Sequence, residues 1–172
     1  MKEVIEAAFP QVLLGNCLEV LTESEFHIFD NEVEPKRCYI KRSNHDPKHF
    51  TVNNSLNQEI NFLAIDKCVL TDKDKTHCDC AVFTNKQFAF IEISDSKKLH
   101  RNQKRRKAKD QLSQTINHFR DKGIVFSEKL NAIICFVSKP VFPARSSSQS
   151  AASLEYFENY GAILLEGNQL DF

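Results

Sequence analysis

The stretch HCDCAVFTNKQFAFIEISDSKK, residues 77–98, decides the fold. Two mostly apolar runs, residues 78–83 and 88–94, are separated by the polar turn TNKQ. Alternating positions are apolar on both faces of each run, which is typical of neighbouring strands in a sheet covered by helices. One carboxylate interrupts each run, Asp79 in the first strand and Glu92 near the end of the second.

Regular elements are also predicted after this stretch. Residues 98–122 are predicted to form a helix, because apolar residues recur at helical spacing and Gly123 follows at the position of a C-terminal cap. The run NAIICFVS, residues 131–138, predicts a buried strand. A loop should then lead to a helix over 150–161 and a final strand over 162–167.

The segments before the stretch are less regular. The run LNQEINFLAI, residues 56–65, is predicted to be a helix that Asn54 or Ser55 caps, and DKCVL, residues 66–70, a strand. In the N-terminal third we expect a short helix over 1–9 and strand pieces within 36–42 and 49–54.

The order helix, three strands, helix, strand, helix, strand predicts an α/β fold with a mixed central sheet flanked by helices. A chain of 172 residues is expected to form a single domain, residues 1–172. Within it we expect an N-terminal extension of unclear structure (1–54), a core (55–138) and an additional C-terminal αβ unit (139–172).

No apolar run approaches the roughly 18 residues that would span a membrane. The N-terminus lacks the pattern of a secretory signal, so we expect a cytoplasmic protein without membrane contact. Six cysteines are expected to be reduced and packed, because their spacing does not form a usual ligand set. The alternative is a zinc site built from Cys68, His77, Cys78 and Cys80.

Charge is unevenly distributed although the formal net charge is zero. Residues 1–35 contain eight acids and one base, which suggests a surface for a protein partner. Residues 97–109 contain eight Lys or Arg and no acid, and such a block suggests contact with phosphates. The alternative for the basic block is a solvated helix face or a localisation signal.

Two carboxylates that meet at one edge of a sheet repel each other unless a cation lies between them. Carboxylate and carbonyl oxygens favour Mg²⁺ or Mn²⁺, and such an ion activates water for phosphodiester hydrolysis. The alternative is that Asp79 and Glu92 form structural ion pairs with nearby Lys or Arg.

Asp79, a turn, FIE ending at Glu92 and a following helix with Gln111 resemble the PD-(D/E)XK nuclease superfamily. The resemblance covers roughly residues 55–138 and implies an αβββαβ restriction-endonuclease-like core. It implies a Mg²⁺- or Mn²⁺-dependent endonuclease acting in restriction, repair or defence, with double-stranded DNA as the expected partner and a homodimer as a possible assembly. RNA stays open as a substrate.

The resemblance also implies roles for individual residues. Asp79, Glu92 and the carbonyl of Ile93 would bind the metal, Glu59 could add a carboxylate, and Gln111 would lie near the site. The expected nucleic-acid-binding residues are Lys97, Lys98, Arg101, Lys104, Arg105, Arg106 and Lys107.

One position departs from the family pattern. The motif lysine is expected two residues after Glu92, where this chain has Ser94. We expect Lys104 or Lys107 of the following helix to replace it in catalysis, with Lys98 as a third candidate. The alternative is a catalytically degenerate protein on the same fold that binds nucleic acid or a protein partner.

Overall fold

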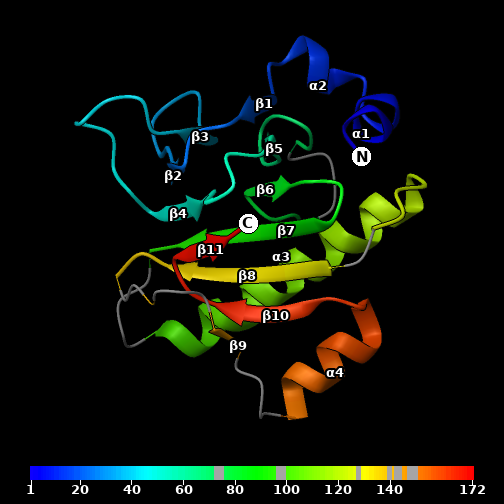
Figure 1. Cartoon of the computed structure of the whole chain (residues 1–172). Coiled ribbons are helices and arrows are strands. Elements are labelled where there is room, and N and C mark those ends of the chain that lie inside the picture. The colour runs from blue at the N-terminus through cyan, green and yellow to red at the C-terminus, as the bar shows by residue number, and fades with distance from the viewer. Residues whose placement is uncertain (72–75, 96–99, 127–128, 139–140, 142–144, 147–150) are drawn as a thin grey trace.

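The structure is a computed structural model, and it describes residues 1–71, 76–95, 100–126, 129–138, 141, 145–146 and 151–172. The described residues form two sheets and four helices (Figure 1). The helices are α1 (Lys2–Ala8), α2 (Gln11–Leu14), α3 (Arg101–Asp121) and α4 (Ala151–Tyr160). No helix in these ranges is long and apolar enough to cross a membrane.

The larger sheet has seven strands in the order β1-β5-β6-β7-β8-β10-β9 within the described residues. Strands β1, β5, β6 and β7 pair antiparallel, whereas β7, β8 and β10 pair parallel. The strands are β1 (Leu18–Leu21), β5 (Ile60–Ala64), β6 (Cys80–Phe83), β7 (Gln87–Ser94), β8 (Lys129–Phe136), β9 (Arg145–Ser146) and β10 (Ile163–Glu166). The predicted mixed α/β sheet is therefore confirmed.

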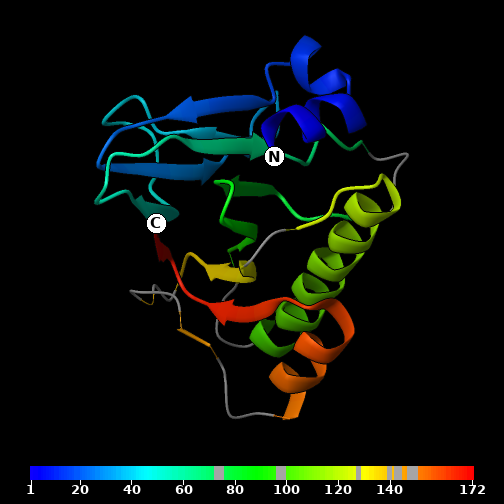
Figure 2. The same ribbon diagram turned by 45° about the vertical axis from the view of Figure 1, so that its right-hand side comes forward.

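The second sheet, in the order β11-β4-β2-β3, lies against one face of the larger sheet (Figure 2). Its strands are β2 (Glu25–Asp30), β3 (Cys38–Ile40), β4 (Phe50–Asn53) and β11 (Gln169–Asp171). One apolar core fills the space between the two sheets, and its members include Phe26, Phe50, Val82 and Ile91. Residues 1–54 thus take part in the main packing of the molecule.

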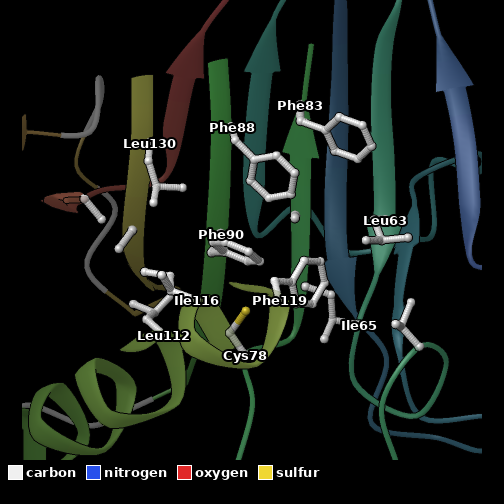
Figure 3. Packing of buried hydrophobic residues seen from close by; sticks show 14 of the residues in the cluster. Leu63, Ile65, Cys78, Phe83, Phe88, Phe90, Leu112, Ile116, Phe119 and Leu130 are labelled. Atoms are coloured by element: carbon white, nitrogen blue, oxygen red, sulfur yellow. The ribbon is translucent and has the colours of Figure 1, made fainter. Parts of the chain in front are cut away.

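A second core lies between the larger sheet and the helices. Phe88 and Phe90 of β7 pack against Leu112, Ile116 and Phe119 of α3 (Figure 3). The ring centroids of Phe90 and Phe119 are 5.1 Å apart in an edge-to-face contact. The predicted helical stripe is confirmed, and it holds α3 across the face of the sheet to which Glu92 belongs.

Gly123 ends α3 as predicted. Its φ of +82° is the left-handed conformation that glycine adopts without steric cost, and its N–H donates to the carbonyl of Arg120 at 2.8 Å.

The prediction of a helix over residues 56–65 is wrong, because Ile60–Ala64 forms β5. The Asn54 side chain bonds Gln58 in both directions, accepting from its N–H at 3.0 Å and donating to its carbonyl at 2.8 Å. These bonds close a turn, so the residues that resemble a helix cap lead instead into a strand.

The predicted strand over residues 66–70 is also wrong. The N–H groups of Cys68, Val69 and Leu70 all converge on the carbonyl of Ile65, which makes this segment a tight turn.

The prediction of reduced cysteines is wrong for one pair, because Cys17 and Cys68 form a disulfide. The other four cysteines are free and buried, as expected. Cys68 is therefore unavailable as a zinc ligand, and Cys78 and Cys80 belong to different cores on opposite faces of the sheet. The alternative of a zinc site is thereby excluded.

Candidate functional site

Asp79 and Glu92 come together on neighbouring strands. Cys80 of β6 pairs with Ile91 of β7, so Asp79 lies beside Glu92 where β6 begins. The Asp79 Oδ2 atom accepts a hydrogen bond of 2.6 Å from the N–H of Ile93. This bond fixes the Asp79 carboxylate against the strand that carries Glu92.

Burial and mutual repulsion dominate the electrostatics of the pair. Burial of its carboxyl group, followed by the negative charge of Asp30, raises the pKa of Asp79 to about 7. Burial, followed by the charge of Asp79, raises the pKa of Glu92 well above its ordinary value. A hydrogen bond between the two side chains favours the proton on Glu92. Without a cation, the pair therefore retains a proton near neutral pH.

Glu92 has an unused ligand atom. The residue is only 7% exposed, and its buried Oε2 atom has no hydrogen-bond partner among the residues that the structure describes. Among the residues that the structure describes, no Lys or Arg forms an ion pair with Asp79 or Glu92. A buried carboxylate without such partners is costly unless it stays protonated or binds a cation.

Ile93 offers a third oxygen at the same place. The N–H and C=O groups of one strand residue point to the same side of the strand. Because the Ile93 N–H points to Asp79, its carbonyl faces the same gap beside the start of β6. Two carboxylates and a carbonyl form a hard-oxygen donor set that suits Mg²⁺ or Mn²⁺.

Of the candidate lysines, Lys107 is the one whose positive charge acts on Glu92. The charge of Lys107 lowers the pKa of Glu92 and thereby partly opposes the effects of burial and of Asp79. Lys104, one helical turn earlier on α3, is exposed. Lys98 lies outside the described residues.

Gln111 lies near the site but is engaged with the main chain. Its Nε2 atom donates to the carbonyl of His77 at 3.0 Å. The hydroxyl of Thr115, one turn further, accepts from the N–H of Cys78 at 2.8 Å. These two bonds tie α3 to the residues that immediately precede Asp79.

Glu59 is not brought to this site. It precedes β5 and lines a separate pocket with Lys2, Thr84 and Asn85, at the turn between β6 and β7. Because β5 runs antiparallel to β6, with Ala64 paired to Cys80, Glu59 lies at the opposite end of these strands from Asp79. The placement of Glu59 among the metal ligands rested on the incorrect helix.

The basic helix begins at the edge where the parallel strands end. Glu92 of β7, Ile134 of β8 and Glu166 of β10 lie in one row across these strands. Arg105 binds Glu166 through two hydrogen bonds, from Nε at 2.9 Å and from a terminal nitrogen at 3.2 Å. The α3 residues 104–107 therefore lie over the row that contains Glu92.

The basic residues divide by environment. Arg101 and Arg105 are partly buried, and both guanidinium groups lie over the ring of Phe136, at 5.5 and 5.6 Å from its centroid. Lys104, Arg106 and Lys107 are exposed, as a phosphate-binding surface requires. Lys97 and Lys98 fall outside the described residues.

Two acids near the pair were not predicted from the sequence. Asp66 contacts the Nε2 atom of His77 at 2.8 Å, and its main-chain N–H donates to the carbonyl of Asp79 at 3.1 Å. Asp30, at the end of β2, acts electrostatically on both Asp79 and Glu92. Neither residue stands in a sequence pattern that signals a site.

No family model, curated protein or solved structure matches the chain.

The described residues contain no group of three or more His, Cys, Asp or Glu side chains close enough to hold a metal together. Any ion bound here would therefore take two carboxylates, with the remaining positions left to the main chain and solvent. The Oε2 atom of Glu92, which has no partner among the described residues, could serve as one of these carboxylate ligands.

Proposed function

We propose that this protein is a metal-dependent nuclease of the PD-(D/E)XK type that hydrolyses phosphodiester bonds, with DNA as its expected substrate. One observation carries the proposal: the partly buried Asp79 and the buried Glu92 form a carboxylate pair with an unpartnered oxygen and no ion pair within the described residues.

The strand arrangement supports the proposal. Three antiparallel strands, β5, β6 and β7, are followed by α3 and by β8, which pairs parallel to β7. This order agrees with the βββαβ part of the core that the proposal assumes. The helix predicted to open that core, residues 56–65, is strand β5 in the structure, whereas α1 packs on the same face as α3, with the rings of Phe9 and Phe119 4.8 Å apart.

In the proposed mechanism, Asp79, Glu92 and the Ile93 carbonyl hold Mg²⁺ or Mn²⁺. A bound divalent ion polarises a phosphate oxygen and lowers the pKa of water. Lys107 replaces the motif lysine, and its ammonium group orients the attacking water and offsets the charge that develops in the transition state. The exposed cations of α3 bind the nucleic-acid backbone.

Plasmid nicking with 10 mM Mg²⁺ or Mn²⁺, a conventional excess, tests the proposal. Asp79→Ala and Glu92→Ala should abolish cleavage and leave DNA affinity largely unchanged. Glu59→Gln is the matched control, because it also removes a carboxylate but at the far end of the strands, and it should cut like the wild type. Metal-dependent cleavage that survives in Asp79→Ala would contradict the proposal.

The second candidate function is a non-catalytic nucleic-acid-binding or protein-interaction module on the same fold. Ser94 at the position of the motif lysine favours it. A wild-type protein that binds DNA through α3 but cuts no DNA or RNA with either ion would establish this alternative. Gain of cleavage in Ser94→Lys would show that only the lysine is missing.

A further inference from the structure

The four-stranded sheet brings one more carboxylate towards the Asp79–Glu92 pair. Asp30 ends β2 and pairs with Cys38 of β3. The Cys38 thiol hydrogen-bonds with Cys80, the residue that follows Asp79. A continuous path of contacts thus leads from Asp30 in one sheet, across the core between the sheets, to Asp79 in the other.

The main chain at Asp30 is held in place. Its N–H donates to the Nδ1 atom of His49 at 3.1 Å, and the N–H of Asn31 donates to the carbonyl of Arg37 at 3.1 Å. These bonds fix the main chain at the end of β2, from which the Asp30 side chain extends.

The Asp30 carboxylate is surrounded by like charges. Burial raises its pKa, and the charges of Asp66 and Glu32 add to that effect. It has no hydrogen bond or ion pair within the part of the chain that the structure describes. Asp30 in turn acts on Asp79 and on Glu92, whose Oε2 atom is buried without a partner. A cation at this place would offset all of these repulsions together.

The distances favour an indirect contact. Asp30, Asp79 and Glu92 are not close enough to chelate one ion together. Mg²⁺ usually retains several of its waters in proteins, and carboxylates that accept hydrogen bonds from such waters strengthen binding. An acid that is near the pair but beyond direct reach suits this outer role.

We propose that Asp30 is a positioning residue of the Asp79–Glu92 cation site and accepts a hydrogen bond from a metal-bound water. The inference rests on the proposed function for the presence of a divalent ion. It gives the N-terminal sheet a part in the site, because β2 supplies the residue.

Calorimetric titration with Mn²⁺ at fixed pH tests the inference without reference to cleavage. Asp30→Asn should weaken Mn²⁺ binding by about 10- to 100-fold, the usual effect of removing an outer partner of a metal site. Glu25→Gln is the matched control, because it removes the same charge from the other end of β2, and it should change the affinity by less than about twofold. Asp30→Glu keeps the charge and should retain most of the affinity.

The melting temperature of each metal-free variant separates this role from a structural one. Asp30→Asn should melt at or above the wild-type temperature, because it removes a repelling charge. Wild-type Mn²⁺ affinity in Asp30→Asn would overturn the inference and leave the proposed nuclease untouched. Mn²⁺ binding that depends on both Asp30 and Asp79, in a protein that cuts no nucleic acid, would uphold the inference and overturn the nuclease. A wild-type protein that binds no Mn²⁺ would overturn both.

Discussion

Thr115 accepts a hydrogen bond of 2.8 Å from the N–H of Cys78, while its own hydroxyl donates to the carbonyl of Gln111 at 2.8 Å. Both Thr115 and Cys78 are fully buried. The Thr115 hydroxyl group, used as both donor and acceptor, thus joins the main helix to the chain just before Asp79, beside the bond from Gln111 to the carbonyl of His77.

Replacing Thr115 by Val should lower the free energy of unfolding by about 1–3 kcal/mol, because the Cys78 N–H is then left buried without a partner. Thr115→Ser keeps the hydroxyl and should cost less. Urea unfolding of the metal-free proteins measures both changes. Equal stabilities for the Val and Ser variants would show that the hydrogen bond is unimportant.

The metal-free protein should lose stability as the pH rises from about 4 to about 7. The folded state raises the pKa of Asp79 from 3.8 to about 7, so it binds a proton that the unfolded chain has already released in this range. The full shift corresponds to roughly 4 kcal/mol. Urea unfolding across this pH range should show the slope in the wild type, and Asp79→Asn should reduce it while leaving the part that comes from the raised pKa of Glu92.

Metal binding should also release protons below pH 7, because the ion displaces the proton that the carboxyl pair retains. Calorimetry in two buffers of different ionisation enthalpy measures the number of protons released when the metal binds. Binding that releases no proton near pH 6 would contradict the placement of the ion at this pair.

Lys107→Ala should reduce the cleavage rate by about 10²- to 10⁴-fold, the usual contribution of a positioned acid or base, and leave DNA affinity within a few-fold. Lys104→Ala, one turn earlier on α3, is the control and should affect affinity more than rate. Single-turnover kinetics distinguish rate from binding. A larger rate loss in Lys104→Ala would assign the catalytic role to Lys104.

The exposed and the engaged arginines of α3 should behave differently. Arg106→Ala should weaken DNA binding and reduce the slope of log affinity against log salt by about one unit, as expected for one lost phosphate contact. Arg105→Ala should chiefly lower the melting temperature, because Arg105 is paired with Glu166 and lies over Phe136. Fluorescence anisotropy at several salt concentrations checks the first, and thermal melting the second.

The disulfide should contribute about 4 kcal/mol, because it closes a loop between cysteines that are 51 residues apart and so restricts the unfolded chain. Dithiothreitol should therefore lower the urea midpoint of the wild type. The double variant Cys17→Ser with Cys68→Ser should not respond to the reductant. A response in the double variant would point to the four buried cysteines instead.

Local signals in the sequence were enough to predict α3, β7 and β8, because their periodicity is long and their ends are marked, as Gly123 shows. The Asp79–Glu92 pair was predictable for a related reason. Its two strands are consecutive in the chain, so pairing them needs only a short turn.

Asp30 could not be predicted in this way. Its approach to Asp79 depends on the packing of two sheets whose strands are far apart in sequence, and no local pattern encodes such a contact. The error at residues 56–65 has another cause, since Asn54 and Gln58 are equally suited to a helix cap and to the turn that they form. Pairing of Ile60–Ala64 with β1 and β6 in the sheet then favours the strand over the helix.

Strand β11 pairs in parallel with β4, and the Asn53 side chain donates to Asp171 at 2.7 Å across 118 residues of chain. Residue 171 must therefore be synthesised before β4 can pair with β11, its second neighbouring strand after β2. Until then β4 presents an open edge to other nascent chains, so the interval between synthesis of β4 and synthesis of β11 is when this protein is most exposed to misassembly.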